Sequence, residues 1–363
     1  GQGSGNNRAS GVASTIEPQG EGKAGGVEIN TASLYVLNGA DVSASTLGVG
    51  DAGSVKITAT EKVIFDGQGS DIFTGAVSSV EPVGEGNAGG VEINTGSLSV
   101  LNGADVSASN FGVGDAGSVK ITATDKVIFD GQGSDILTGV TSQVNSKGEG
   151  NAGDVEITTA SLSVLNGARV SANTFGKGDA GSVEISAKTF EAKSGGIISN
   201  LTSTEFTAGN IILNVTDNIT LTGSDTGIFA NTTEGSTGKG GSIIIDPKIM
   251  TVKDGAAISV NSEGEGIGGD IELAAGFLTL DNGTISAQTR SNTGGNITLN
   301  LQDVLLLRNN SQISSTAGNQ QFGGDGGNIS INSPFIVALP NENSDITANA
   351  FEGRGGNVDI ITQ

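Results

Sequence analysis

A glycine-rich hexapeptide is the first stretch of this sequence whose residue types could do chemistry. Residues 48–53 read GVGDAG, which fits the G-x-G-x-x-G pattern of dinucleotide-binding loops. That pattern indicates a nucleotide site only when a strand precedes it and a helix follows, because the helix N-terminus receives the pyrophosphate. The residues that follow, SVKITAT, alternate apolar and polar side chains and therefore predict a strand. The pattern also returns at several places, so it indicates a repeat and no cofactor is expected; further copies begin at Gly20, Gly84, Gly112, Gly148 and Gly176.

Two other glycine-rich segments could bind phosphate or calcium. TGKGGS (237–242) lacks the Ser or Thr that directly follows the lysine in a phosphate-binding loop, and no helix is expected after it. GGDGGNISI (323–331) is the nearest match to the calcium-binding nonapeptide of β-helices, but its single Asp is misplaced. GVGDAG offers one carboxylate per turn, whereas calcium takes six to eight oxygen ligands. No metal site is expected.

Groups suited to catalysis are scarce. The chain has no His and no Cys, which removes the usual general base and the usual zinc and haem ligands. Asp154, Glu156 and Asp179 are expected to be neighbours, but as solvated surface carboxylates. Met250 and Tyr35, the remaining candidates for haem ligation, fall at positions expected to pack in the coil wall. We expect no catalytic residue and hence no enzyme.

The composition excludes several partners. Asp and Glu number 39 against 17 Lys and Arg, giving a net charge of −22. A surface this acidic repels nucleic acid and anionic membranes, and no apolar run approaches the length of a membrane span. The 60 glycines and the Val, Ile, Leu and Ala content suit thin walls of strands better than a globular core.

The repeat itself is long and divides in two. Residues 20–83 and 84–147 align without a gap and are nearly identical, and a third copy begins at Gly148 and drifts after Lys188. An AG or GG dipeptide before a Val or Ile marks twelve units along the whole chain. Three residues after each marker stands a branched aliphatic residue: Val27, Val55, Val91, Val119, Val155, Val183, Ile211, Ile243, Ile271, Ile297, Ile329 and Val358. A second aliphatic column follows two residues later, so each unit begins with a strand that has one buried face.

Each unit continues with a corner and two more apolar stretches. In nine successive units a polar residue stands fourteen residues after the marker and is followed directly by glycine, as in Asn38-Gly39 and Asp66-Gly67. This pair predicts a sharp turn. An apolar stretch such as LYVL (34–37) precedes the turn, and a third such as VSA (42–44) or DIF (71–73) follows it. All variation in unit length is expected beyond this third stretch. The pattern predicts an all-β, right-handed parallel β-helix of about 12 coils of about 28–32 residues, each with three short strands.

Polar columns on the surface are expected to support the stacking. The residues between the two aliphatic columns read Glu28, Lys56, Glu92, Lys120, Glu156 and Glu184, so opposite charges would lie side by side on adjacent strands. A second column just before the marker begins Lys23, Asp51. An Asn/Asp column is expected to form a hydrogen-bonded ladder at one corner.

These repeats resemble a known family. The segment GNAGGVEINTGSLSVLNGADVSASNFGVGDAGSVKITA, which begins at Gly86, is similar to the repeats of the filamentous-haemagglutinin-like large exoproteins of cyanobacteria. The similarity is strong over residues 20–190 and moderate beyond, and no segment matches the family's amino-terminal secretion domain. The resemblance implies a β-helix exported by an outer-membrane partner of the two-partner secretion type, and a role in attachment, aggregation or sheath formation.

The sequence thus predicts one continuous shaft over 1–363, with a partial coil at 1–23, near-identical repeats over 24–187 and degenerate coils over 188–363. We expect a secreted or cell-surface structural protein that self-associates end to end or laterally into fibres, since neither terminus shows a polar cap. The alternative is a carbohydrate-binding or polysaccharide-degrading β-helix, with a surface polysaccharide as partner and recognition near 76–83 and 140–147.

Overall fold

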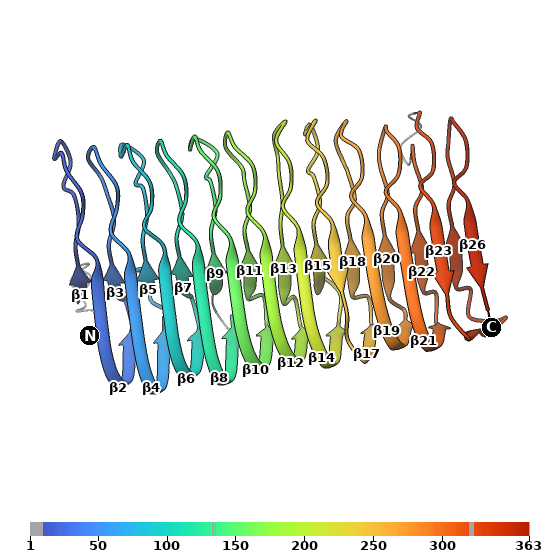
Figure 1. The fold of residues 1–363 in the computed structure, drawn as a ribbon, viewed down its shortest axis with the longest axis horizontal. Coiled ribbons are helices and arrows are strands. Elements are labelled where there is room, and N and C mark those ends of the chain that lie inside the picture. The colour runs from blue at the N-terminus through green and yellow to red at the C-terminus, as the bar shows by residue number, and fades with distance from the viewer. Residues whose placement is uncertain (1–9, 133, 135, 319–322, 363) are drawn as a thin grey trace. The chain divides into compact units, whose positions relative to one another are not determined.

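The computed structural model describes residues 10–132, 134, 136–318 and 323–362. All regular structure in these residues is β-strand. The chain divides into two compact units, Gly1–Glu184 and Ile185–Gln363. Each unit is a right-handed parallel β-helix, as predicted, and together they contain about twelve coils (Figure 1). Residues 1–9 of the predicted partial coil lie outside the described residues, and continuity of the shaft across residues 184 and 185 stays a prediction.

In unit 1, Gly1–Glu184, each coil contributes a long strand to one parallel sheet and a short strand to another. The long sheet has the order β2 (Val27–Leu37), β4 (Val55–Asp66), β6 (Val91–Leu101), β8 (Val119–Asp130), β10 (Val155–Leu165). The short sheet has the order β1 (Ser10–Ala13), β3 (Ala40–Ser43), β5 (Thr74–Val77), β7 (Ala104–Ser107), β9 (Gly139–Thr141), β11 (Arg169–Ser171). The division between the units falls inside β12 (Val183–Lys193).

Unit 2, Ile185–Gln363, repeats this plan. Its long sheet has the order β14 (Ile211–Thr222), β16 (Ile243–Ile245), β19 (Ile271–Asp281), β21 (Ile297–Arg308), β23 (Ile329–Asn332), β26 (Val358–Ile361). Its short sheet has the order β13 (Ile197–Ser199), β15 (Gly227–Phe229), β18 (Ala257–Ser259), β20 (Thr284–Ser286), β22 (Gln312–Ser314), β25 (Asp345–Thr347). Two further strands complete the long sheet: β17 (Ile249–Lys253) beside β14 and β19, and β24 (Phe335–Ala338) beside β21.

The aliphatic columns stack in the predicted register. In unit 1 the first column pairs directly from coil to coil, in the order Val27, Val55, Val91, Val119, Val155. In unit 2 it pairs as Ile211, Ile243, Ile271, Ile297, Ile329, Val358. Side chains in the inner coils of both columns are buried, because each coil covers the apolar edge of the one before it.

The first two predicted strands of a coil are joined in most coils. In β2 they form one bent strand, with a register irregularity between Thr31 and Ser33. They separate where a proline stands between them, at Pro247 between β16 and β17 and at Pro334 between β23 and β24. Proline has no backbone N–H to donate to the ladder, so it interrupts the strand.

The predicted corners are partly confirmed. Asn38 and Gly39 both have positive φ, 51° and 77°, which is the conformation of a two-residue turn that Asn and Gly tolerate. The prediction for Asp66-Gly67 is wrong, because the positive φ values occur two residues later, at Gln68 (53°) and Gly69 (73°).

The predicted third strand at DIF (71–73) is also wrong. The short strand of that coil is β5 (Thr74–Val77), in which Gly75 pairs with Asp41 of β3. Most of the additional residues in this coil therefore lie before the third strand, and the expectation that length varies only beyond it fails. Strand position is set by pairing with the neighbouring coil, which local apolar pattern does not record. The displaced segment places Phe73 at the start of β5.

The polar columns behave as predicted. Lys56 Nζ lies 3.7 Å from a Glu92 carboxylate oxygen, and Lys120 Nζ lies 2.8 Å from Glu156. Lys23 lies 2.9 Å from Asp51 in the second column. Corner amides also bond across coils, with Asn102 Nδ2 donating to Asp66 Oδ1 at 2.9 Å and Asn166 Nδ2 to Asp130 Oδ1 at 2.8 Å.

Candidate functional site

The GVGDAG loops are occupied by the stacking of the coils. Backbone amides that a phosphate loop would present are already used: Val49 donates to the Gly20 carbonyl at 2.9 Å, and Ala52 to the Asn87 carbonyl at 2.8 Å. The glycines provide room for this contact, since a Cβ on Gly50 would lie 1.5 Å from the carbonyl oxygen of Gly22. The repeated glycines therefore permit close approach of successive backbones.

The three carboxylates singled out in the sequence do not converge on one point. Glu156 pairs with Lys120, as described above. Asp154 accepts a hydrogen bond from the Ser182 amide at 2.7 Å, and the Asp179 amide donates to Asn151 Oδ1 at 3.0 Å. Within the described residues no group of three or more His, Cys, Asp or Glu side chains could hold a metal ion.

The two haem-ligand candidates differ from each other. Met250 is fully buried in the coil wall, as expected. Tyr35 was expected to pack but is exposed, with Lys62 Nζ lying 5.1 Å from its ring centroid. Its side chain points outward from β2, and the equivalent residue of the next 64-residue repeat is Ser99 of β6.

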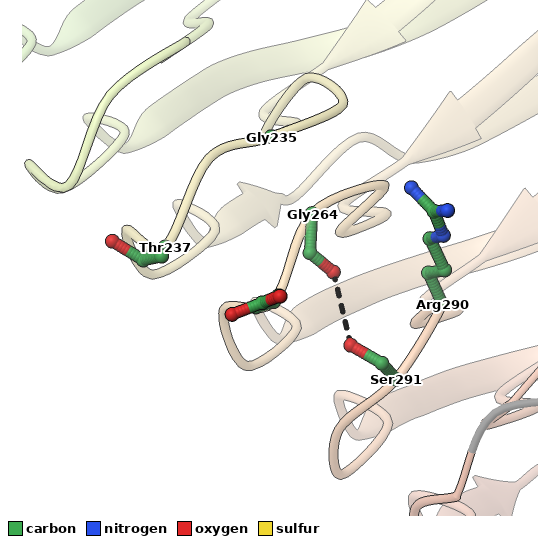
Figure 2. Close-up of a pocket in the computed structure, with 6 residues that line it drawn as sticks. Gly235, Thr237, Gly264, Arg290 and Ser291 are labelled. Atoms are coloured by element: carbon green, nitrogen blue, oxygen red, sulfur yellow. Dashed lines mark hydrogen bonds between the residues drawn. The ribbon is translucent and has the colours of Figure 1, made fainter.

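Unit 2 has an open pocket of about 520 Å³ among its surface loops, shown in Figure 2. Its lining includes Glu265, Arg290 and Ser291, and Ser291 Oγ donates to the Gly264 carbonyl at 3.3 Å. Arg290 forms an ion pair with Glu234 at 3.0 Å. The pocket is lined mainly by loop residues, and its Arg290 already has an acidic partner, so the lining does not indicate one class of ligand.

Unit 1 has a pocket of about 490 Å³ on the outer face of its short sheet, lined largely by strand residues. We call it the short-sheet groove and define it by its floor on β3, β5, β7 and β9 (Figure 1) and by its apolar margins. Phe73 and Leu137 stand just before β5 and β9, and Leu47 and Phe111 stand beyond the ends of β3 and β7. The groove thus crosses the strands, with apolar side chains at both ends of them.

The floor of the groove is a network of hydroxyl and carboxyl groups. Thr141 Oγ1 donates to Asp105 Oδ2 at 2.8 Å and lies 3.2 Å from Ser107 Oγ. Ser107 Oγ is 2.9 Å from Ser109 Oγ. A second branch joins Ser45 to Ser79 at 2.9 Å, and Ser79 donates to Glu81 Oε1 at 2.7 Å. Hydroxyl groups both donate and accept, so this floor can adapt to a polar ligand.

Asp105 is the exceptional member of this network. Its side chain is only 8% exposed, and Oδ1 has no hydrogen-bond partner. Burial raises the pKa of this carboxyl group to about 7, against the lowering effects of the Thr141 hydrogen bond and of the Val106 amide. Asp105 therefore changes charge near neutral pH.

The sequence indicated this region only in part. The loops named as candidates for recognition, 76–83 and 140–147, do supply Val77, Ser79, Glu81, Thr141 and Gln143 to the groove. Asp105, Phe73 and Phe111 were missed. A signal did exist, since Asp41 and Asp105 are identical outward-facing residues of consecutive 64-residue repeats, placed where a solvated strand face was expected.

Comparisons of the chain with protein-family models, curated proteins and solved structures found no significant match. In the part of the chain that the structure describes, no helix is long and apolar enough to cross a membrane.

Proposed function

We propose that this chain is a repeat segment of a secreted or cell-surface exoprotein of the filamentous-haemagglutinin-like kind, and that it acts as a structural and adhesive shaft. The observation that carries the proposal is the register of the aliphatic columns, which is kept through coils of unequal length in both units. Each coil needs only its two neighbours for burial, so further coils can lengthen such a structure without changing it.

The surface supports the same role. The net charge of −22 keeps a long polymer soluble and repels nucleic acid. A polar column continues from coil to coil in unit 1, with Asn87 accepting from the Asp115 amide at 2.8 Å and Asp115 accepting from the Asn151 amide at 2.7 Å. Groups used for stacking in this way are distributed along the chain and do not form a single reaction centre.

A length experiment tests the shaft. Duplicating residues 84–147 inserts two coils, and at about 4.8 Å per coil the longest dimension should grow by about 10 Å. Small-angle X-ray scattering of the full chain and of the duplicated chain measures this change. An unchanged longest dimension, with only the cross-section increased, would contradict the proposal.

Location and attachment need their own tests. We propose that the protein is exported with the help of an outer-membrane partner and associates with other copies, end to end or side by side. Antibody against the chain should label intact cells of the source organism, and beads coated with the chain should be retained on those cells more than uncoated beads. Labelling that requires permeabilised cells would refute the extracellular location.

The proposed role is not enzymatic. Incubation of the chain with neutral linear hexasaccharides should release no new reducing ends. Release that persists in the purified protein and is lost in Asp105→Asn would instead favour the polysaccharide-degrading alternative, because a carboxyl group with a raised pKa is suited to protonate a leaving group.

A further inference from the structure

We infer that the short-sheet groove of unit 1 is a binding site for a linear, uncharged polysaccharide, with Asp105 and the floor hydroxyls as its polar contacts and Phe73, Leu137, Leu47 and Phe111 as its apolar margins. This goes beyond the proposed shaft, and the two can fail separately. The shaft concerns how coils stack, whereas the groove concerns what one face of them binds.

One carboxyl group of the groove is not satisfied by the protein. Asp105 lines the groove but is only 8% exposed, and its Oδ1 is shielded from solvent and has no hydrogen-bond partner. A buried polar atom without a hydrogen bond destabilises the folded state. The stacking of the coils does not require an Asp here, since the paired positions on β5 and β9 are Gly75 and Gly139. A ligand hydroxyl would satisfy this atom once the carboxyl group turns Oδ1 toward the groove, which binding of the ligand would favour.

The groove contains the same set of groups twice. Coils of two lengths alternate, so residues two coils apart are equivalent: Asp41 with Asp105, Leu47 with Phe111, and Phe73 with Leu137. Two coils span about 9.6 Å. The groove therefore presents one set of polar and apolar groups twice along the direction in which coils stack. A ligand that matches it has a chain with a regular repeat.

The charged side chains of the groove are acidic. The lining includes the carboxyl groups of Asp41, Glu81 and Asp105, and no Lys or Arg among the described residues lines the groove. A polyanionic ligand, such as a uronate polymer or a nucleic acid, would be repelled. A neutral chain that donates hydroxyl hydrogen bonds to carboxylates gains charge-assisted contacts.

The position of the groove suits a glycan better than a peptide. Peptides commonly bind to sheets by adding a strand to a free edge. The groove instead crosses strands β3, β5, β7 and β9, whose backbone groups already pair with one another. It offers short hydroxyl groups between apolar and aromatic margins, which suits sugar rings with hydroxyls at their rims and apolar C–H faces.

Calorimetric titration of the full chain tests the inference. The probes are cellohexaose, xylohexaose, mannohexaose, maltohexaose and laminarihexaose at pH 8, with the matching disaccharides and polygalacturonate for comparison. At least one neutral hexasaccharide should bind with a Kd below about 1 mM, and its disaccharide should bind at least about tenfold more weakly, because it reaches only one of the two equivalent sets of groups.

Three variants locate the site. Asp105→Asn preserves the side-chain shape and should weaken binding about tenfold, since it removes the charge-assisted acceptor. Phe73→Ala, whose side chain is 37% exposed in the native chain, should weaken binding by a similar factor. Glu92→Gln is the matched control: it lies in the same coil as Asp105 but on the long strand β6, and it should leave the Kd unchanged.

Circular dichroism at each titration condition confirms that the variants are folded. The inference is overturned if no neutral hexasaccharide binds, if polygalacturonate binds in preference, or if Asp105→Asn and Phe73→Ala both leave the Kd unchanged. Each of these results leaves the length measurement on the duplicated chain unaffected, so failure of the groove and failure of the shaft are distinguishable.

Discussion

Asp105→Asn should stabilise the protein at alkaline pH and have little effect at acidic pH. The substitution replaces a buried carboxyl group by a neutral side chain of nearly the same shape, and Thr141 can still donate to the amide oxygen. Burial raises the pKa of Asp105 in the folded chain from its ordinary value of 3.8 to about 7. The folded state therefore holds this proton more tightly than the unfolded state does.

The sign and size of the effect follow from linkage. Below pH 3.8 the group is protonated in both states and contributes no pH-dependent penalty. Between pH 3.8 and about 7 the folded state binds more protons, so the free energy of unfolding falls as pH rises, and above about pH 7 the full penalty is present. A difference of about 3 pKa units corresponds to about 4 kcal/mol at about 1.4 kcal/mol per unit.

Urea unfolding followed by far-UV circular dichroism at pH 4 and pH 8 measures this penalty. The other acidic residues also titrate, so the informative quantity is the difference between Asp105→Asn and the native chain at each pH. That difference should grow by up to about 4 kcal/mol in favour of the variant between pH 4 and pH 8. Glu92→Gln, on the outer face of the long sheet, should show no comparable growth. A pH-independent difference, or a less stable Asp105→Asn at pH 8, would show that the carboxyl group is not desolvated as described.

Four other substitutions, one of them a control, separate the forces that hold the coils together. Gly53→Ala should lower the free energy of unfolding by more than about 2 kcal/mol, because the added Cβ would lie 2.0 Å from the Gly25 carbonyl oxygen. In the control Gly25→Ala the Cβ would meet only a serine hydroxyl at 3.3 Å, so the free energy of unfolding, measured by urea titration of both variants, should change far less. Phe65→Ala should cost about 3–5 kcal/mol in the same assay, since the ring is fully buried and the coil above it limits collapse of the cavity; a cost below about 1 kcal/mol would contradict this packing. Lys120→Gln should leave the melting temperature at physiological salt unchanged within error, because its ion pair with Glu156 is about half exposed, and a clear drop that salt abolishes would show that this column matters more than expected.

The sequence predicted the stacking well because every coil contains the residues that stack. A branched aliphatic residue at positions such as Val27, Val55 and Val91 is needed wherever a side chain points inward, so the column can be read without knowledge of the three-dimensional structure. The corner at Asn38-Gly39 was readable for the same reason, since few residues other than Gly and Asn accept its positive φ.

The features that failed depend on pairing between coils. The segment 71–73 has an apolar pattern that fits a strand, yet its coil pairs through Thr74–Val77, because Gly75 and not Asp71 stands beside Asp41. Likewise, no local pattern distinguishes Asp105 from a solvated outward residue. Its burial comes from the side chains that neighbouring coils place around it, so the repeated Asp41 and Asp105 could mark the position in the sequence but could not reveal the groove.

Alternation of coil length explains how a stacked structure acquires a groove at all. Identical coils would present the same outer face at each level, and a shaft needs nothing more. In unit 1 the long coils have additional residues before β5 and β9. These residues include Phe73 and Leu137, which line the groove just before the two strands, and the aliphatic columns keep their register. The alternating coil lengths thus keep the aliphatic columns in register while most of the additional residues fall at the margin of the short sheet. If recognition is the reason for this alternation, replacing residues 67–73 by the two-residue turn Asn-Gly should preserve folding and abolish binding of the neutral hexasaccharide. Retained binding in the shortened chain would separate coil length from recognition.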